Sequence, residues 1–190
     1  MKEFKLVPFV TCELGEAIDL QVEIDWSDDG SMLLIQFGFV GAIDRLKIPP
    51  VSDAPQRKTG LWETTCFECF LGSLGQENYW EINLSPSGDW NVFRLDGYRK
   101  NLREERAIET LPVLVKRQGD RMTIEVTLDV RKLGLCRDAI ELSATSVLEE
   151  ITGEEITGDI SCDISYWAIA HTGAIADFHL RNSFVISGLG

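Results

Sequence analysis

The stretch that decides the fold is LWETTCFECFLGSLGQENYWEINLSPSGDWNVFRLDGYR, residues 61–99. It contains three short runs of strand-forming residues, separated by turns rich in Gly, Asn, Ser and Pro. Three of the five tryptophans, Trp62, Trp80 and Trp90, lie here among several carboxylates. The stretch therefore predicts consecutive antiparallel strands that carry a candidate binding face.

The segments around this stretch alternate apolar and polar residues with a period of two, as half-buried antiparallel strands do. In residues 18–26, for example, Ile18, Leu20 and Val22 fall on one face, and a turn at 27–30 leads into the return strand 32–39. A second hairpin is expected from 113–117 and 121–128, around a turn at 118–120. Further strands are expected at 4–10 (broken at Pro8), 139–148, 165–170 and 183–186.

Helical segments are nearly absent from the pattern. A short turn is expected at 129–134, with Asp129 as N-cap and Gly134 as C-cap. Residues 99–110 fit one or two helical turns or a solvated loop, whereas 40–60 and 149–162 are expected to be loops. The sequence therefore predicts an all-β protein, a single antiparallel β-sandwich of jelly-roll type with one or two short helical turns, as one domain over residues 1–190.

Composition narrows the classes of partner. The formal net charge of −13 disfavours binding to phosphate backbones, so no nucleic-acid partner is expected. No run approaches the roughly 18 apolar residues of a membrane span, so no membrane partner is expected either.

The N-terminus and the cysteines favour a cytoplasmic protein. The start, MKEFKLVPFV, lacks the apolar region of a signal peptide. The number of cysteines is odd and most lie in apolar runs, which is typical of buried free thiols in a reducing compartment. They are Cys12, Cys66, Cys69, Cys136 and Cys162.

Side-chain parity along the three central strands suggests a polar face with aromatic edges. If the strands are neighbours, one face collects the residues Glu68, Tyr79, Glu81, Asn83, Trp90 and Arg94. Aromatic rings stack on the C–H faces of a sugar, and Glu, Asn and Arg pair with its hydroxyl groups. The alternative is an ordinary solvated face, on which Glu opposite Arg is a common cross-strand pair.

The same carboxylates allow a catalytic interpretation. Glu68 and Glu81 on adjacent strands are expected about 5 Å apart, the separation used by retaining glycosidases. A glycan-acting hydrolase is therefore an alternative to a binding protein, although chance carboxylate pairs are expected in so acidic a chain.

Three other groups are candidates for metal, redox or haem chemistry. Cys66 and Cys69 have CxxC spacing, but residues i and i+3 of a strand point to opposite faces, which favours core thiols. His171, Asp177 and His179 could bind a metal, or His171 and Asp177 could form a dyad, yet their spacing matches no standard motif. Met32 and Met122 lie in core patterns, so no Met/His haem pair can be placed, and neither a cofactor nor a metal is expected.

Several of these segments together resemble the DOMON-like proteins, relatives of DOMON domains and of family-nine carbohydrate-binding modules. They are LWETTCFECFLG, YWEINLSPSGDWNVFRLDGYR, IEVTLDVRKLGL and YWAIAH followed by ADFHLRNSF, which extend from about residue 60 to the C-terminus.

The resemblance implies a jelly-roll sandwich with a ligand site on one sheet face, where DOMON domains bind haem or sugars. The sugar-binding members use paired stacking tryptophans, for which Trp62 with Trp90 or Trp167 are the candidates. The sequence thus predicts a non-catalytic protein that binds a carbohydrate or carbohydrate-like small molecule, and it leaves the oligomeric state open.

Overall fold

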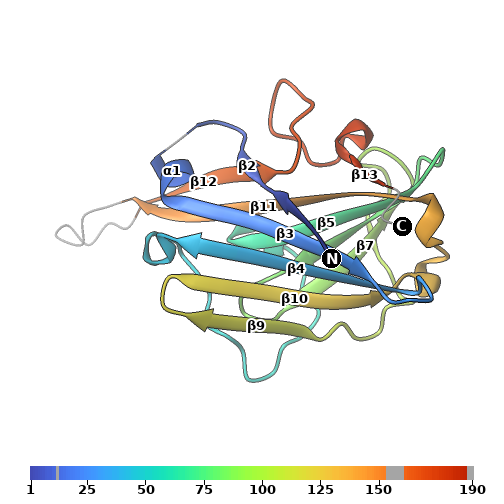
Figure 1. Ribbon diagram of the computed structural model, residues 1–190, viewed down its shortest axis with the longest axis horizontal. Helices are drawn as coiled ribbons and strands as arrows, with labels where there is room; N and C mark the ends of the chain where they lie inside the picture. Colours follow the sequence, from blue (N-terminus) through green and yellow to red (C-terminus); the bar gives the residue numbers. More distant parts are fainter. Residues whose placement is uncertain (12, 153–160, 188–190) are drawn as a thin grey trace.

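The computed structural model describes residues 1–11, 13–152 and 161–187, which form two antiparallel sheets packed face to face (Figure 1). Sheet A has the strand order β1-β3-β4-β10-β9. Its strands are β1 (Lys2–Lys5), β3 (Ile18–Trp26), β4 (Met32–Gly41), β10 (Arg121–Asp129) and β9 (Val113–Gln118).

Sheet B has the order β2-β12-β11-β5-β6-β7-β8, and β13 also pairs with β11. Its strands are β2 (Val7–Pro8), β12 (Ser161–Ala168), β11 (Ile140–Thr152), β5 (Cys66–Ser73), β6 (Tyr79–Leu84), β7 (Trp90–Leu95), β8 (Arg103–Glu104) and β13 (Ile186–Ser187). The expected all-β antiparallel sandwich is confirmed.

Helical structure is limited to short pieces between the strands. They are α1 (Glu13–Ala17) and the 3₁₀ turns η1 (Ile43–Arg45), η2 (Leu61–Glu63), η3 (Val130–Leu133), η4 (Arg137–Ala139) and η5 (Arg181–Ser183). The predicted capping of η3 is confirmed, because the Asp129 carboxylate accepts from the Arg131 N–H and Gly134 has a φ of +71°. The short helix α1 was not expected from the sequence.

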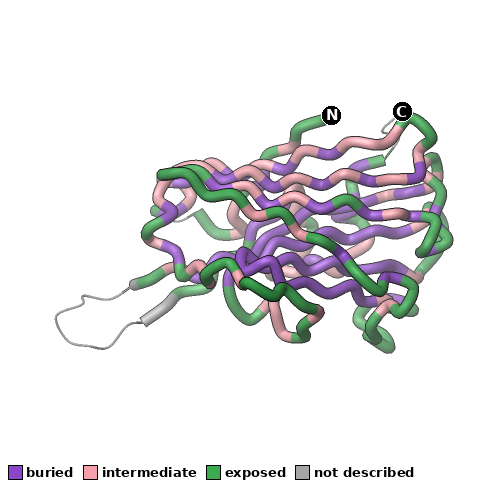
Figure 2. Tube along the Cα trace, turned by 90° about the horizontal axis from the view of Figure 1, so that it is seen from below, coloured by how far each residue is buried: buried purple, intermediate pink, exposed green. Residues whose placement is uncertain are grey.

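The main core lies between the two sheets. Alternation in sheet A sends Leu20, Val22 and Phe37 inward, where each is at most 1% exposed. From sheet B, Phe67 and Ile82 meet them, and the rings of Phe37 and Phe67 lie 5.3 Å apart between centroids. Figure 2 shows this core as buried segments alternating with half-buried ones along sheet A. Removal of these apolar side chains from water is what holds the sheets together.

Several segments differ from expectation for identifiable reasons. Residues 99–110 form no helix, because β8 pairs with β7 there. The expected loop 149–162 is narrower, since β11 runs to Thr152 and β12 begins at Ser161, and residues 153–160 lie outside those described. The expected strand 183–186 is reduced to Ile186–Ser187, preceded by η5.

The N-terminal run divides at Leu6 between the two sheets. β1 pairs with β3 in sheet A, whereas β2 pairs with β12 in sheet B, where Pro8 lies at an edge and needs no ladder donor. In the part of the chain that the structure describes, no helix is long and apolar enough to span a membrane.

Candidate functional site

Other segments of the chain pack on the outer face of sheet B and shield much of it from solvent. Along β5 and β6 almost every residue is buried, on both faces of the strands. The cover comes from the loop at 96–102 and from residues 170–184, whose aromatic rings pack on the sheet. The resulting second apolar cluster contains Phe70, Tyr79, Phe93, Leu95, Val147, Ala168, Phe178 and Phe184, with Trp62 packed against it.

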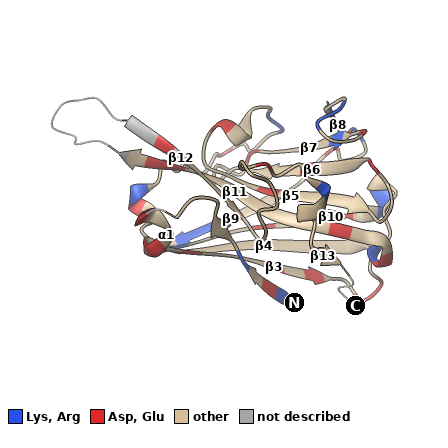
Figure 3. Cartoon of the chain, turned by 90° about the horizontal axis from the view of Figure 1, so that it is seen from above, with Lys and Arg blue, Asp and Glu red and all other residues tan. Residues whose placement is uncertain are grey.

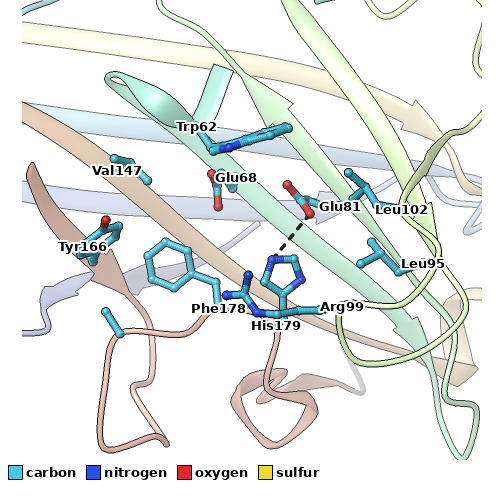
Figure 4. Close-up of a pocket in the computed structure, with 11 residues that line it drawn as sticks. Trp62, Glu68, Glu81, Leu95, Arg99, Leu102, Val147, Tyr166, Phe178 and His179 are labelled. Carbon is cyan, nitrogen blue, oxygen red and sulfur yellow. Dashed lines mark ion pairs between the residues drawn. The ribbon is translucent and has the colours of Figure 1, made fainter. Parts of the chain in front are cut away.

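A cavity of about 460 Å³ opens between this cover and the sheet (Figure 4). Its size falls within the usual range of small-molecule sites, about 300–1,000 Å³. The residues that line it are Trp62, Glu68, Glu81, Leu95, Arg99, Leu102, Val147, Tyr166, Ala176, Phe178 and His179.

Two carboxyl groups form the floor of this pocket. Glu68 on β5 is 3% exposed and Glu81 on β6 is 5% exposed. In the register of β5 and β6, Glu68 pairs with Asn83 and Phe70 pairs with Glu81, so the two glutamates are diagonal neighbours. The expected separation of about 5 Å is therefore wrong for their backbone positions, because diagonal pairs lie roughly 7–8 Å apart.

Each carboxyl group has one hydrogen bond from a neighbouring side chain. Thr145 donates to Glu68 Oε2 at 3.2 Å, and Asn83 Nδ2 donates to Glu81 Oε1 at 2.8 Å. Burial, and then the neighbouring charge of Glu81, raise the pKa of Glu68 well above its usual value. Burial also raises the pKa of Glu81, although the Asn83 hydrogen bond opposes the shift. The pair therefore retains a proton more readily than exposed glutamates do.

His179 lies beside Glu81, with its Nε2 atom 3.9 Å from Glu81 Oε2. Its Nδ1 atom is hydrogen-bonded to the Tyr79 hydroxyl at 2.8 Å, and the tautomer of the ring decides which of the two groups donates. Burial, and then the positive charge of Arg99, lower the pKa of His179 to about 4. The imidazole is therefore neutral at pH 7.

Arg99 reaches the pocket from a strained backbone. Its φ of +52° lies in the left-handed region, which costs a residue other than Gly about 1–3 kcal/mol. The guanidinium donates to Asp177 Oδ1 at 3.0 Å, and the Tyr98 hydroxyl donates to Asp177 Oδ2 at 2.5 Å. Burial raises the pKa of Asp177, but the hydrogen bonds from Tyr98, His179 N–H and Arg99 outweigh it and the net shift is downward. Asp177 therefore stays ionised and fixes Arg99.

Aromatic rings form the walls of the pocket. The ring of Trp62, from η2, packs edge-on against Phe93 at 5.7 Å between centroids. On the opposite wall, Phe178 packs against Tyr166 at 6.0 Å, and Tyr166 remains 43% exposed. Such braced rings offer flat apolar surfaces to a ligand while losing little side-chain freedom.

The predicted site residues divide into three groups. Trp62, Glu68 and Glu81 line the pocket. Tyr79 and Asn83 share its face but are 0% exposed, and they act behind it by bonding to His179 and Glu81.

Trp90 and Arg94 do not share that face, and this part of the prediction is wrong. Trp90 pairs with Leu84 and Arg94 pairs with Trp80, so both project inward with the core residues of β6. The guanidinium of Arg94 lies over the Trp80 ring at 5.4 Å, and Arg57 covers the Trp90 ring at 4.4 Å. The alternation of side chains along a strand shows which residues share a face within that strand. It does not show which face of the next strand lies on the same side of the sheet, because that depends on the register between the strands.

Trp167 is also misplaced by the prediction. It is 1% exposed in the main core, and its Nε1 donates to Ser165 Oγ at 2.9 Å. The adjacent Tyr166 points to the other face and lines the pocket, as the alternation of side chains along a strand requires.

The histidine hypotheses are not supported by the contacts. His171 Nε2 lies 2.9 Å from the Val7 carbonyl, whereas Asp177 holds Tyr98 and Arg99, so the proposed dyad is wrong. Within residues 1–11, 13–152 and 161–187, no group of three or more His, Cys, Asp or Glu side chains could hold a metal ion.

The cysteine expectations are partly confirmed. Cys66 and Cys69 are buried free thiols on opposite faces of β5, whereas Cys136 is exposed. Cys12 and the side chain of Cys162 lie outside the described part of the chain.

Sequence reasoning missed the residues that close the pocket. Arg99 follows β7 at the end of the 61–99 stretch, whereas Tyr166, Phe178 and the pocket-facing role of His179 come from segments distant from β5 and β6 in sequence. One usable signal was the density of aromatic and charged residues in ADFHLR, residues 176–181. The long loop at 40–60 does not line this pocket, and its Pro55–Arg57 portion lies instead near Trp90 and Leu111.

Comparisons with known proteins identify a shared fold. No family model and no curated protein matches the chain. A candidate carbohydrate-binding protein from Bacteroides uniformis has a TM-score of 0.57 at 11% identity, over 93% of this chain and 82% of that chain. A family 9 carbohydrate-binding module from Caldicellulosiruptor kristjanssonii, in complex with glucose, gives a TM-score of 0.43 at 11% identity, over 86% and 70%. The first likeness shows that the Bacteroides protein shares this fold.

Proposed function

We propose that the protein binds a carbohydrate or carbohydrate-like small ligand, without catalysis, in the pocket on the outer face of sheet B. The observation that carries this proposal is the pairing of two buried carboxyl groups, Glu68 and Glu81, with the aromatic wall of Trp62 in one cavity. A sugar needs both elements, because its C–H face stacks on a ring while its hydroxyl groups require fixed polar partners.

The fold agrees with this proposal but does not carry it. The Bacteroides protein of similar fold is described as a candidate carbohydrate-binding protein. One fold hosts many functions, so the argument rests on the site. In the site, Tyr79 and Asn83 hold the polar groups in place, which reduces the ordering cost that a ligand has to offset.

The first experiment is a thermal-shift screen of the purified protein against mono- and oligosaccharides, sugar phosphates and haem. A sugar hit is expected, and Glu81→Ala is expected to abolish it while the variant keeps the far-UV circular dichroism of the wild type. Glu125→Ala, a carboxylate removed from the outer face of sheet A, is the matched control. A Glu81→Ala variant that binds as well as wild type, or a screen without any sugar hit, contradicts the proposal.

A glycan-acting hydrolase remains the second candidate, because Glu68 and Glu81 face one cavity and the Glu68 pKa is raised toward that of a general acid. Turnover distinguishes the two functions. A hydrolase releases the aryl group from at least one member of a broad aryl-glycoside panel, and Glu68→Gln and Glu81→Gln each remove that activity. A binding protein shows the thermal shift without turnover.

A further inference from the structure

We propose that the sugar bound in this pocket carries a positively charged amino group, which is held between the carboxyl groups of Glu68 and Glu81. This inference rests on the proposed function and specifies the class of sugar. It follows from the charges that face the cavity, from the free hydrogen-bonding capacity of the two carboxyl groups and from the nature of the walls.

The pocket floor has two acidic groups, and among the described residues no Lys or Arg forms an ion pair with either of them. Arg99 lines the cavity, but its guanidinium is paired with Asp177 at 3.0 Å, and its charge only partly opposes the rise that burial causes in the pKa of Glu68 and Glu81. His179 is neutral at pH 7 because its pKa is lowered. The nearby Tyr79 hydroxyl and Cys66 thiol are also neutral, because burial raises the pKa of each. Glu68 and Glu81 therefore form an acidic pair that holds a proton at pH 7 and, in the described part of the chain, has no protonated base paired with it.

Basic residues close to the pocket do not change this balance. Figure 3 shows blue segments around β8, at the rim formed by sheet B. Arg103 in that region is paired with Asp96 at 2.7 Å, and its register with Arg94 puts it on the face of sheet B opposite to the cavity floor. The net charge of −13 also favours the approach of cations over anions to the protein as a whole.

The two carboxyl groups have room for donors from a ligand. Figure 4 shows both side chains directed into the cavity, with His179 near Glu81. Among the described residues, Glu68 accepts from Thr145 and Glu81 accepts from Asn83, each through one oxygen. An ionised carboxylate has about four acceptor positions, and a buried one is costly without a counter-charge. An ammonium group supplies three donors and the charge, whereas a hydroxyl supplies one donor and no charge.

The walls also suit a cation. The rings of Trp62, Phe178 and Tyr166 line the same cavity, and aromatic faces attract cations at distances within about 6 Å. An amino sugar therefore uses the carboxyl pair and the rings together, whereas a neutral sugar uses the rings but brings no positive charge to the carboxyl pair. Because the pair retains a proton at neutral pH, an ammonium that enters between the groups replaces it, and binding releases a proton to the solvent.

The test is isothermal titration calorimetry at pH 7 with matched sugars. Glucosamine, galactosamine, mannosamine and 6-amino-6-deoxyglucose are compared with their neutral parents, and the 2-amino sugars also with their N-acetyl forms, which remove the charge. We expect at least one amino sugar to bind ten-fold or more tightly than its neutral parent. Titrations in phosphate and Tris buffers are expected to give different apparent enthalpies for the amino sugar, because a proton is released.

The variants assign this selectivity to the carboxyl pair. Glu81→Gln keeps the size of the side chain and removes its charge, so the ten-fold preference is expected to fall to about two-fold or less. Glu125→Gln makes the same change of net charge on sheet A and is expected to leave the preference intact. If Glu81→Gln does not fold, Glu68→Gln provides the same test from β5.

The outcomes separate this inference from the proposed function. Neutral sugars that bind as tightly as amino sugars overturn the amino-sugar inference and leave carbohydrate binding in place. A preference for amino sugars that survives in both Glu68→Gln and Glu81→Gln has the same consequence. The absence of binding by every sugar in the panel overturns both.

Discussion

The outer faces of the two sheets differ in what covers them. On sheet A, the outward residues Asp19, Gln21 and Glu23 of β3 are half-buried and border solvent, as one face of an antiparallel sheet usually does. On sheet B, the outward residues Glu68 and Phe70 of β5 are almost fully buried. The segments that cover sheet B turn its outer face into a pocket. They also remove the carboxyl groups of Glu68 and Glu81 from most of the surrounding water.

The largest expected effect tests whether the outer face of sheet B is a true second core. Phe67 and Phe70 are near neighbours on β5 with 0% and 1% exposure, but they point to opposite sides. Phe70 packs against Phe178, Phe184 and other rings of the cover. We expect Phe70→Ala to reduce the free energy of unfolding by about 3–5 kcal/mol, as Phe67→Ala should.

Urea unfolding of both variants measures this comparison. A loss of only a few tenths of a kcal/mol for Phe70→Ala would mean that the outer face is solvated and that the cover does not pack on it.

A pair of glycines tests the cover with a smaller change. A Cβ at Gly72 on β5 would lie 1.7 Å from Nη1 of Arg181, whose Nη2 donates to the carbonyls of Ser73 and Gln76 and to the Glu141 carboxylate. Gly72→Ala should displace this arginine and lower stability by about 1–3 kcal/mol. On sheet A, a Cβ at Gly38 has no neighbour within 4 Å, so Gly38→Ala is the matched control.

The melting temperatures of the two alanine variants give the answer. Gly38→Ala is expected to be near neutral. Equal melting temperatures for both variants would contradict an Arg181 that is packed over β5.

The last effect concerns pH. In the unfolded chain Glu68 ionises near its usual pKa of 4.5, whereas in the folded protein its pKa is raised by burial and by Glu81. At a pH between these two pKa values, the folded state keeps a proton on Glu68 that the unfolded state releases. The contribution of Glu68 to the free energy of unfolding is therefore fully present below pH 4.5 and is lost as the pH rises through the folded-state pKa. Glu68→Gln removes this loss and should stabilise the protein at pH 8 by about 1.4 kcal/mol for each unit of the raised pKa.

Unfolding at pH 5 and pH 8 measures this change as a difference between variant and wild type. His179 acts in the opposite direction, since its pKa is lowered to about 4 and it costs stability as the pH falls below 6.5. That contribution is common to both proteins and cancels in the difference. A gain for Glu68→Gln that is the same at both pH values would show that Glu68 is ionised throughout.

The contrast between the sheets also explains how far the sequence could predict the structure. Sheet A was predictable because its strands have one face in the core and the other at the surface, so the alternation in Ile18–Trp26 marks the strand and its burial together. In sheet B the same parity separates the two faces of β5 and β6 correctly. It does not show that both faces are buried, because Glu68 and Glu81 are polar residues in a covered position.

The site was predictable only in part for the same reason. Glu68, Glu81 and Trp62 could be found from strand parity and local composition. Trp90 and Arg94 could not be assigned, because the register of β6 against β7 depends on long-range pairing. Arg99 enters the pocket from the turn after β7 and His179 from a loop distant in sequence, and no local pattern encodes either placement.

The measurement that tests the central claim most directly is calorimetric titration of the best sugar ligand into the wild type, Trp62→Ala and Trp90→Phe. Trp62 lines the outer pocket of sheet B, whereas Trp90 is 6% exposed and faces the main core. The account predicts that Trp62→Ala weakens binding at least ten-fold and that Trp90→Phe leaves the affinity within about two-fold of the wild type. Loss of affinity in Trp90→Phe with wild-type affinity in Trp62→Ala would place the ligand elsewhere and contradict it.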